Sequence, residues 1–156
     1  MSIPTILKQF TEALFTTFEE TFEQVHGIYL DKGTSLFETL ATITPEEASR
    51  PVSAKCASIA AQVNHVRFYL DVLEQYMEGG NPGKVDWDSS WQVEAVTSAE
   101  WEDLVQRLKA SHQRVLATMK GYESWDGEEN INGAIAMLVH TAYHLGEIRQ
   151  ALCTIK

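Results

Sequence analysis

Apolar side chains recur at helical spacing through long segments of this chain, and that pattern constrains the fold more than any other feature. In residues 5–30 the repeat runs through Ile6, Phe10, Leu14, Phe18, Phe22 and Tyr29. A recurrence every three or four residues is typical of an amphipathic helix. Long helices are expected at residues 5–30, 51–78, 97–120 and 128–154. No stretch alternates for long enough to predict a strand, so the sequence predicts an all-α protein, with a four-helix bundle as its natural architecture.

Residue types that favour helix ends mark several boundaries. Thr44 followed by Pro45 predicts a brief helical turn in the segment TPEEAS, because proline suits the first helical position. Pro51 is expected to open the second long helix, which ends at the breaker GGNPG. The segment TSAE is a capping box, in which the Thr97 hydroxyl accepts from an early amide and Glu100 reaches back.

The connection between the second and third long helices is unusually long. Its 18 residues, GGNPGKVDWDSSWQVEAV, span roughly 60 Å when extended, whereas the preceding helix is about 40 Å long. The connection can therefore cross the bundle, so that the two helices run parallel. Trp87 and Trp91 lie in it. We expect them to anchor the loop to the core, with the alternative that one of them lines the mouth of a pocket.

The length of the chain predicts a single domain, residues 1–156. The composition of its segments predicts that this domain is cytoplasmic. No apolar run approaches the roughly 20 residues that a membrane span needs. The first residues, MSIPTILKQF, lack the basic start and long apolar core of a signal peptide. Cys56 and Cys153 are not spaced as metal ligands, and we expect both to be reduced and buried.

The charge balance narrows the range of partners. The formal net charge is −10, and no basic cluster is present that would neutralise nucleic-acid phosphates. An anionic membrane surface would repel such a chain. A small molecule or another protein is the expected partner.

Three histidines lie on helix faces that are otherwise apolar. His140 and His144 are four residues apart and share a stripe with Glu147, at about 100° per residue. Their neighbours on this stripe are small, namely Gly133, Ala136 and Ala151. His65 falls on the inner face of the second long helix. Three neutral imidazoles can bind one divalent ion and leave a position open for water or substrate; zinc, nickel, iron or copper would suit them.

Ordinary structural roles are the alternative for each of these residues. An inward histidine is more often a hydrogen-bonded core residue than a ligand, so the pattern leaves both interpretations open. Glu147 either accepts a proton, supports the metal or simply forms a salt bridge at the surface. Tyr69 and Tyr76 share the face of His65, where they either orient a substrate or pack in the core.

Neither the remaining histidines nor two better-known metal motifs predict a second metal site. His26 near the end of the first helix suits the helix dipole, and His112 is expected to be exposed. Thr141 stands where a zincin needs glutamate. A di-iron carboxylate bundle needs two E-x-x-H pairs, and the chain has one, Glu23 to His26.

Three segments together resemble the DinB-like (also called YfiT-like) family. They are IAAQVNHVRFYLDVL, VDWDSSW followed by EWEDLVQRL, and LVHTAYHLGEIRQAL. The resemblance covers nearly the whole chain and implies an up-down-down-up four-helix bundle, a single metal held by His65, His140 and His144, and a dimer. Characterised relatives include transferases and isomerases that use a low-molecular-weight thiol, and others were proposed as hydrolases. Leu145 and Glu147 depart from the family pattern, so only the ligands are carried over.

These observations lead to three hypotheses. The first is a metal-dependent enzyme, a thiol-dependent transferase or a hydrolase, that activates a bound water or thiol for a small-molecule substrate. The second is a non-catalytic metal-binding or stress-related bundle, and the third is an interaction module without metal. The last long helix has few polar positions before Arg149. Such a helix is usually covered on both sides, so we expect a homodimer.

Overall fold

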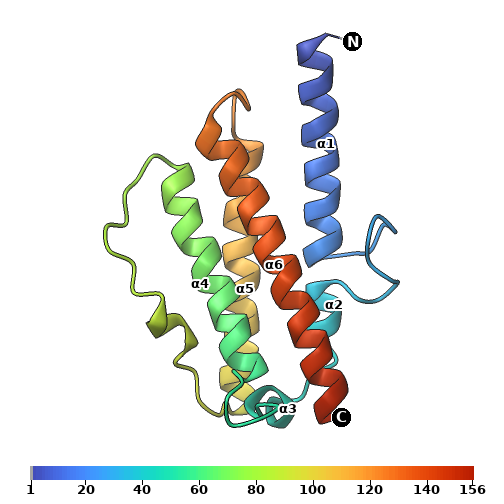
Figure 1. Cartoon of the computed structure of the whole chain (residues 1–156), viewed down its shortest axis with the longest axis vertical. Coiled ribbons are helices and arrows are strands. Elements are labelled where there is room, and N and C mark those ends of the chain that lie inside the picture. The colour runs from blue at the N-terminus through green and yellow to red at the C-terminus, as the bar shows by residue number, and fades with distance from the viewer. Residues whose placement is uncertain (1) are drawn as a thin grey trace.

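Four long helices form the bundle in the computed structural model, which describes residues 2–156 (Figure 1). They are α1 (Ile3–Phe22), α4 (Ile59–Met77), α5 (Ser98–Lys120) and α6 (Glu128–Ile155). The short helices α2 (Leu36–Leu40) and α3 (Pro45–Ser49) follow α1, and a 3-10 turn, η1 (Asp88–Trp91), interrupts the long crossover. Figure 1 shows α1 and α6 running one way and α4 and α5 the other. The expected all-α, up-down-down-up bundle is confirmed.

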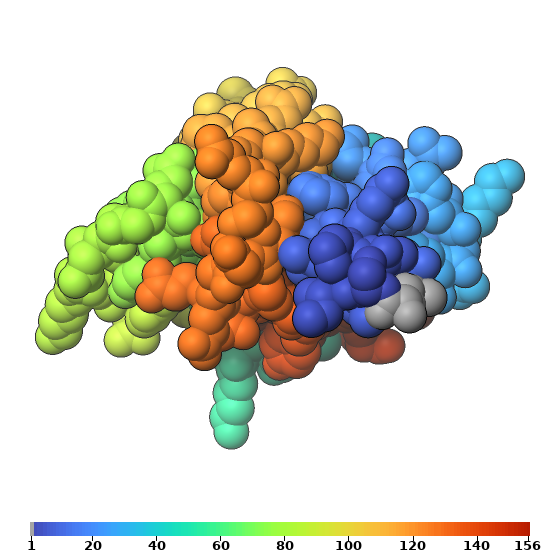
Figure 2. Space-filling view, turned by 90° about the horizontal axis from the view of Figure 1, so that it is seen from above, coloured from blue at the N-terminus to red at the C-terminus, as the bar shows by residue number. Residues whose placement is uncertain are grey.

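The packing order places α4 and α6 side by side. α4 contacts both α5 and α6, and α6 also contacts α1. Seen from the end where α1 begins, the start of α6 lies between α4 and α1 (Figure 2). The crossover descends along the outside of α4, and η1 packs against that helix. The α4–α6 pair is thus covered by the crossover near its middle.

A continuous apolar core joins the four long helices. Phe18 of α1, Leu70 of α4, Leu108 of α5 and Ile148 of α6 are all fully buried and belong to one cluster. Protein cores are close-packed and transmit strain rather than absorb it. This core therefore sets the spacing between α4 and α6.

The first helix is shorter than expected, because the chain turns back around one buried carboxylate. α1 ends at Phe22, so the expected helix over residues 23–30 is wrong. Glu20 accepts four backbone N–H bonds at 2.7–2.9 Å, from His26, Ile28, Tyr29 and Leu30. Gly27, with φ +81°, supplies the left-handed residue that this turn requires.

The second long helix begins later than expected, at Ile59 rather than at Pro51. Ser58 caps it, since its side chain accepts from the amide of Ala61 at 3.1 Å. Residues 51–56 are exposed, so this stretch has little burial to offset the cost of ordering a helix. The other boundaries agree with expectation: Thr44 caps α3, and Thr97 with Glu100 forms the capping box of α5.

One further expectation, the burial of the two cysteines, is wrong. Cys56 and Cys153 are both free in residues 2–156, as expected, but both are exposed rather than buried. Cys56 lies in the irregular stretch before α4, and Cys153 lies in the last turns of α6. No helix in the described part of the chain is long and apolar enough to cross a membrane.

Candidate metal centre

The structure brings His65, His140 and His144 together between α4 and α6. One ring nitrogen from each lies within 4.8 Å of the others, and the Nε2 atoms of His65 and His140 are 3.1 Å apart. Zinc–nitrogen bonds of about 2.0–2.1 Å place two ligand nitrogens about 3.3 Å apart in a tetrahedral site. The cluster is therefore compatible with a metal site.

Hydrogen bonds orient two of the three rings. Nδ1 of His65 lies 2.7 Å from Ser90 Oγ, which itself donates to the carbonyl of Trp87 at 2.6 Å. Ser90 Oγ must then accept from His65, so that Nδ1 carries the proton. Nδ1 of His144 likewise faces acceptors, Glu147 Oε2 at 3.0 Å and Gln62 Oε1 at 3.3 Å. Both arrangements leave the Nε2 lone pair free for a metal.

His140 is held by stacking rather than by a hydrogen bond at Nδ1. Its ring lies parallel to that of Tyr69, with centroids 3.6 Å apart and planes 8° apart. Its buried Nδ1 has no hydrogen-bond partner within the described residues. At 3.1 Å, its Nε2 and that of His65 either share a hydrogen bond or bind one ion.

The electrostatic environment keeps these rings neutral. Burial lowers the pKa of His65 to about 4, with a further lowering by His144 that Glu147 opposes. Burial, followed by repulsion from the other two rings, lowers the pKa of His140 to about 3. Burial also lowers the pKa of His144, against the opposing charge of Glu147. Neutral imidazole is the form that binds metals.

The two tryptophans of the crossover have different roles. Trp91 stacks on His65, with centroids 3.9 Å apart, and lines a cavity of about 620 Å³ beside the cluster. Trp87 packs against Phe68 and Tyr69, each at 5.7 Å between centroids. The anchoring interpretation therefore suits Trp87, and the pocket interpretation suits Trp91. Tyr76 is 40% exposed, so the core-packing alternative is wrong for that residue.

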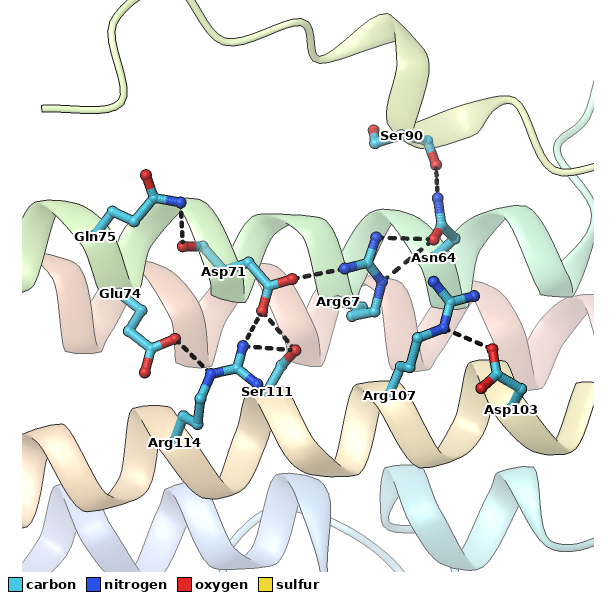
Figure 3. A network of polar contacts seen from close by, with 10 residues as sticks. All are labelled: Asn64, Arg67, Asp71, Glu74, Gln75, Ser90, Asp103, Arg107, Ser111 and Arg114. Carbon is cyan, nitrogen blue, oxygen red and sulfur yellow. Dashed lines mark hydrogen bonds and ion pairs between the residues drawn. The ribbon is translucent and has the colours of Figure 1, made fainter.

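A polar network supports the turn that holds His65 (Figure 3). Asn64 Nδ2 donates to the carbonyl of Ser90 at 2.8 Å, and Arg67 donates to Asn64 Oδ1 and to Asp71. Asp71 also accepts from Arg114 of α5 at 2.6 Å. The network thus connects η1 through α4 to α5. The sequence did not identify Ser90 or Asn64 as residues of the site. Their only signals in the sequence are that Ser90 lies between two tryptophans and that Asn64 directly precedes His65.

Three further residues that the sequence singled out lie outside the three-histidine cluster itself. Glu147, which shares the histidine stripe, contacts His144 and is 40% exposed. His26 lies beyond the end of α1, with Nε2 3.0 Å from Glu19. The expected exposure of His112 is wrong, since it is 1% exposed and stacks against Phe22. The face of α5 that carries His112 packs against α1, and a single-helix pattern does not reveal that contact.

The fold and the histidine cluster define an all-helical bundle protein with a candidate three-histidine metal centre. A family model described as the DinB superfamily matches residues 30–148. The chain therefore belongs to the DinB superfamily, which confirms the resemblance seen in its motifs. Comparisons with curated proteins and with solved structures found no match.

Proposed function

We propose that this protein is a metal-dependent enzyme whose divalent ion, nickel, zinc or iron, is held by His65, His140 and His144. The observation that supports it is the convergence of three neutral rings, two with their Nδ1 protons bound by acceptors, beside a cavity of about 620 Å³. A bound divalent ion would supply Lewis-acid chemistry, lowering the pKa of a water molecule or thiol that it binds.

Glu147 is the proposed proton acceptor. Its carboxylate contacts Nδ1 of His144, the ring nitrogen that faces away from the proposed ion, and also lines the cavity, so it lies beside a small molecule bound there. A general base has to lie within hydrogen-bond reach of the proton that it removes. The two candidate reactions are hydrolysis and transfer to a low-molecular-weight thiol.

A non-catalytic metal-binding or stress-related bundle is the alternative. Its supporting observation is that the histidines come from two helices, His65 from α4 and the other two from α6. An ion shared between them would tie these helices together and stabilise the fold.

Elemental analysis after incubation with nickel or zinc tests both metal proposals. We expect one ion per chain in the wild type and little in His65→Ala or His140→Ala. His26→Ala is the matched control, since this histidine lies outside the cluster. A wild-type metal content near zero would rule out both proposals.

Glu147→Gln separates the enzyme from the structural alternative. Because the amide oxygen of the variant still accepts from Nδ1 of His144, which Gln62 also faces, the variant should keep its ion and its melting temperature. It should lose about 10²–10⁴-fold in hydrolase or thiol-transfer rate. If the wild type has no such activity and His65→Ala loses its fold, the structural alternative is favoured.

A homodimer in the cytoplasm completes the proposal. α6 presents an outward stripe of exposed apolar side chains, Ile135, Val139 and Tyr143. Exposed apolar surface of this kind is a common sign of a protein interface. The two free, exposed cysteines accord with a reducing compartment.

A further inference from the structure

Gln62 of α4 is a buried polar side chain in the wall of the cavity beside the histidine cluster. It lies one turn before His65 and is 7% exposed. It lines the cavity of about 620 Å³. Among the described lining residues only Ala151 is also buried, so Gln62 is the polar group in this wall that is most shielded from solvent.

The histidine cluster fixes the direction of the Gln62 amide. Its Oε1 lies 3.3 Å from Nδ1 of His144. That ring nitrogen carries the proton when Nε2 binds a metal. Only the oxygen of the amide can accept from it, so the NH₂ group of Gln62 has to face another direction.

That NH₂ group is a free donor. The Gln62 side chain makes no other hydrogen bond within residues 2–156. Its Nε2 is not among the fully enclosed polar atoms that lack a partner, so it is open to the space that the side chain lines. A largely buried donor without a partner costs free energy. A molecule in the cavity recovers that free energy if it accepts from Nε2.

The rest of the lining suits an apolar body beside this donor. Trp91 and Tyr143 offer aromatic faces, and a Cβ placed on Gly146 would meet nothing within 4 Å. A mostly apolar wall with a few placed polar groups is typical of small-molecule sites. Gln150 offers a second side-chain amide, but it is exposed, so it exchanges a hydrogen bond to water for one to the ligand and gains little.

We propose that Gln62 is a specificity-determining residue, whose Nε2 donates to a carbonyl oxygen on a substrate with an apolar body. The inference rests on the proposed function, because it names the substrate class of the same site. Nδ1 of His144 faces away from the proposed ion, so the amide adds to any binding that the ion supplies. A site that hydrogen-bonds its substrate rejects an analogue without that group, because the buried donor is then left unpaired.

The test compares acetophenone with α-methylstyrene, which has the same shape but a CH₂ group in place of the carbonyl oxygen. Each probe is titrated into the full-length chain in the presence of zinc. Binding is followed by ¹H–¹⁵N NMR at the side-chain amide of Gln62, which reports on the donor itself. We expect acetophenone to shift this signal and to bind about five- to tenfold more tightly than α-methylstyrene.

Two variants remove the donor in different ways. Gln62→Met removes the whole amide without changing the charge, whereas Gln62→Glu keeps an oxygen for Nδ1 of His144. Both should lose the preference for acetophenone and bind α-methylstyrene as the wild type does. Gln150→Met and Gln150→Glu are the matched controls, at an exposed position of the same lining, and should keep the preference.

Three results would overturn the inference. They are equal affinity of the wild type for the two probes, an unchanged Gln62 signal, and a preference for acetophenone that survives in either Gln62 variant. The third would show that another group recognises the carbonyl. A chain that binds no ion but loses the preference in both Gln62 variants contradicts only the proposed function.

Discussion

Each of the three clustered histidines is held by a different kind of contact. His65 donates to a serine hydroxyl, His144 faces a carboxylate, and His140 stacks on a tyrosine. Partners of this kind set the ring orientation and tautomer, and their loss weakens metal binding even though they never touch the ion. The contacts around the rings therefore matter as much as the rings themselves.

Ser90→Ala tests this idea at the best-defined partner. Removing the hydroxyl leaves Nδ1 of His65 without its acceptor, so the affinity for zinc or nickel should fall about 10–100-fold. A competition titration against a chelator measures the change, and circular dichroism should show unaltered helix content. Ser89→Ala is the control, because its hydroxyl bonds only to the carbonyl of Asp86. Equal affinities for the two variants would contradict the prediction.

His112 gives a prediction about acid stability. Burial, with a smaller contribution from Lys120, lowers its pKa to about 4 from 6.5, and Glu23 is the acidic group facing it, 3.4 Å from Nδ1. Between these pH values the unfolded chain therefore binds more protons than the folded chain. The contribution of neutral His112 to the free energy of unfolding is complete above about pH 6.5 and falls by about 3 kcal/mol as the pH drops towards 4.

His112→Phe should remove that part of the pH dependence. The new ring suits its neighbours, since His112 already stacks on Phe18 and Phe22. Urea unfolding at several pH values between 7 and 4 measures the free energy of unfolding for both proteins. We expect a shallower decline in the variant, and parallel curves would show that His112 does not cause it.

At the scale of elements, the ends of helices depend on contacts that lie outside them. α1 stops where the chain turns back to the buried Glu20, and α4 starts where Ser58 caps it. Both ends fall within segments whose residues allow a longer helix. A capping or bridging side chain decides the end because it satisfies amides that would otherwise be unpaired.

Glu20→Gln tests the turn after α1. Burial would raise the pKa of Glu20, but four backbone N–H bonds lower it to about 2. Its contribution to stability is therefore complete above about pH 4.5 and is lost as the pH falls towards 2. The amide keeps one acceptor oxygen and no charge, so the melting temperature at pH 7 should fall by several degrees.

Hydrogen exchange locates that effect. In Glu20→Gln, the amides of residues 26–30 should exchange faster, because their acceptor is weakened. Glu19→Gln is the control, as that carboxylate is more than half exposed and contacts only the His26 ring. Unchanged exchange in the Glu20 variant would show that the turn is held by other contacts.

At the scale of the whole molecule, α6 connects the core, the cluster and an exposed apolar stripe. Val139 is 60% exposed and Tyr143 is 62% exposed, whereas Met137 and Leu145 on other faces are buried. Apolar side chains on a helix surface bury favourably when a second copy covers them. The proposed dimer therefore places α6 at its interface.

Val139→Asp tests the dimer. Light scattering at micromolar concentration should give twice the mass of one chain for the wild type and the mass of one chain for the variant. Gln113→Asp adds the same charge at an exposed position of α5, away from this stripe, and should leave the dimer intact. A wild-type mass of one chain would contradict the proposed interface.

The sequence by itself determined the features that depend on near neighbours along the chain. Helical periodicity, the capping boxes at Thr44 and Thr97, and the shared stripe of His140 and His144 all arise within a few residues. Only the tertiary structure decided that His112 is buried. It also decided that Ser90 lies beside His65, from which it is 25 positions away in the sequence. Such contacts depend on which helix faces pack together, and that choice is made by the whole core rather than by any one segment.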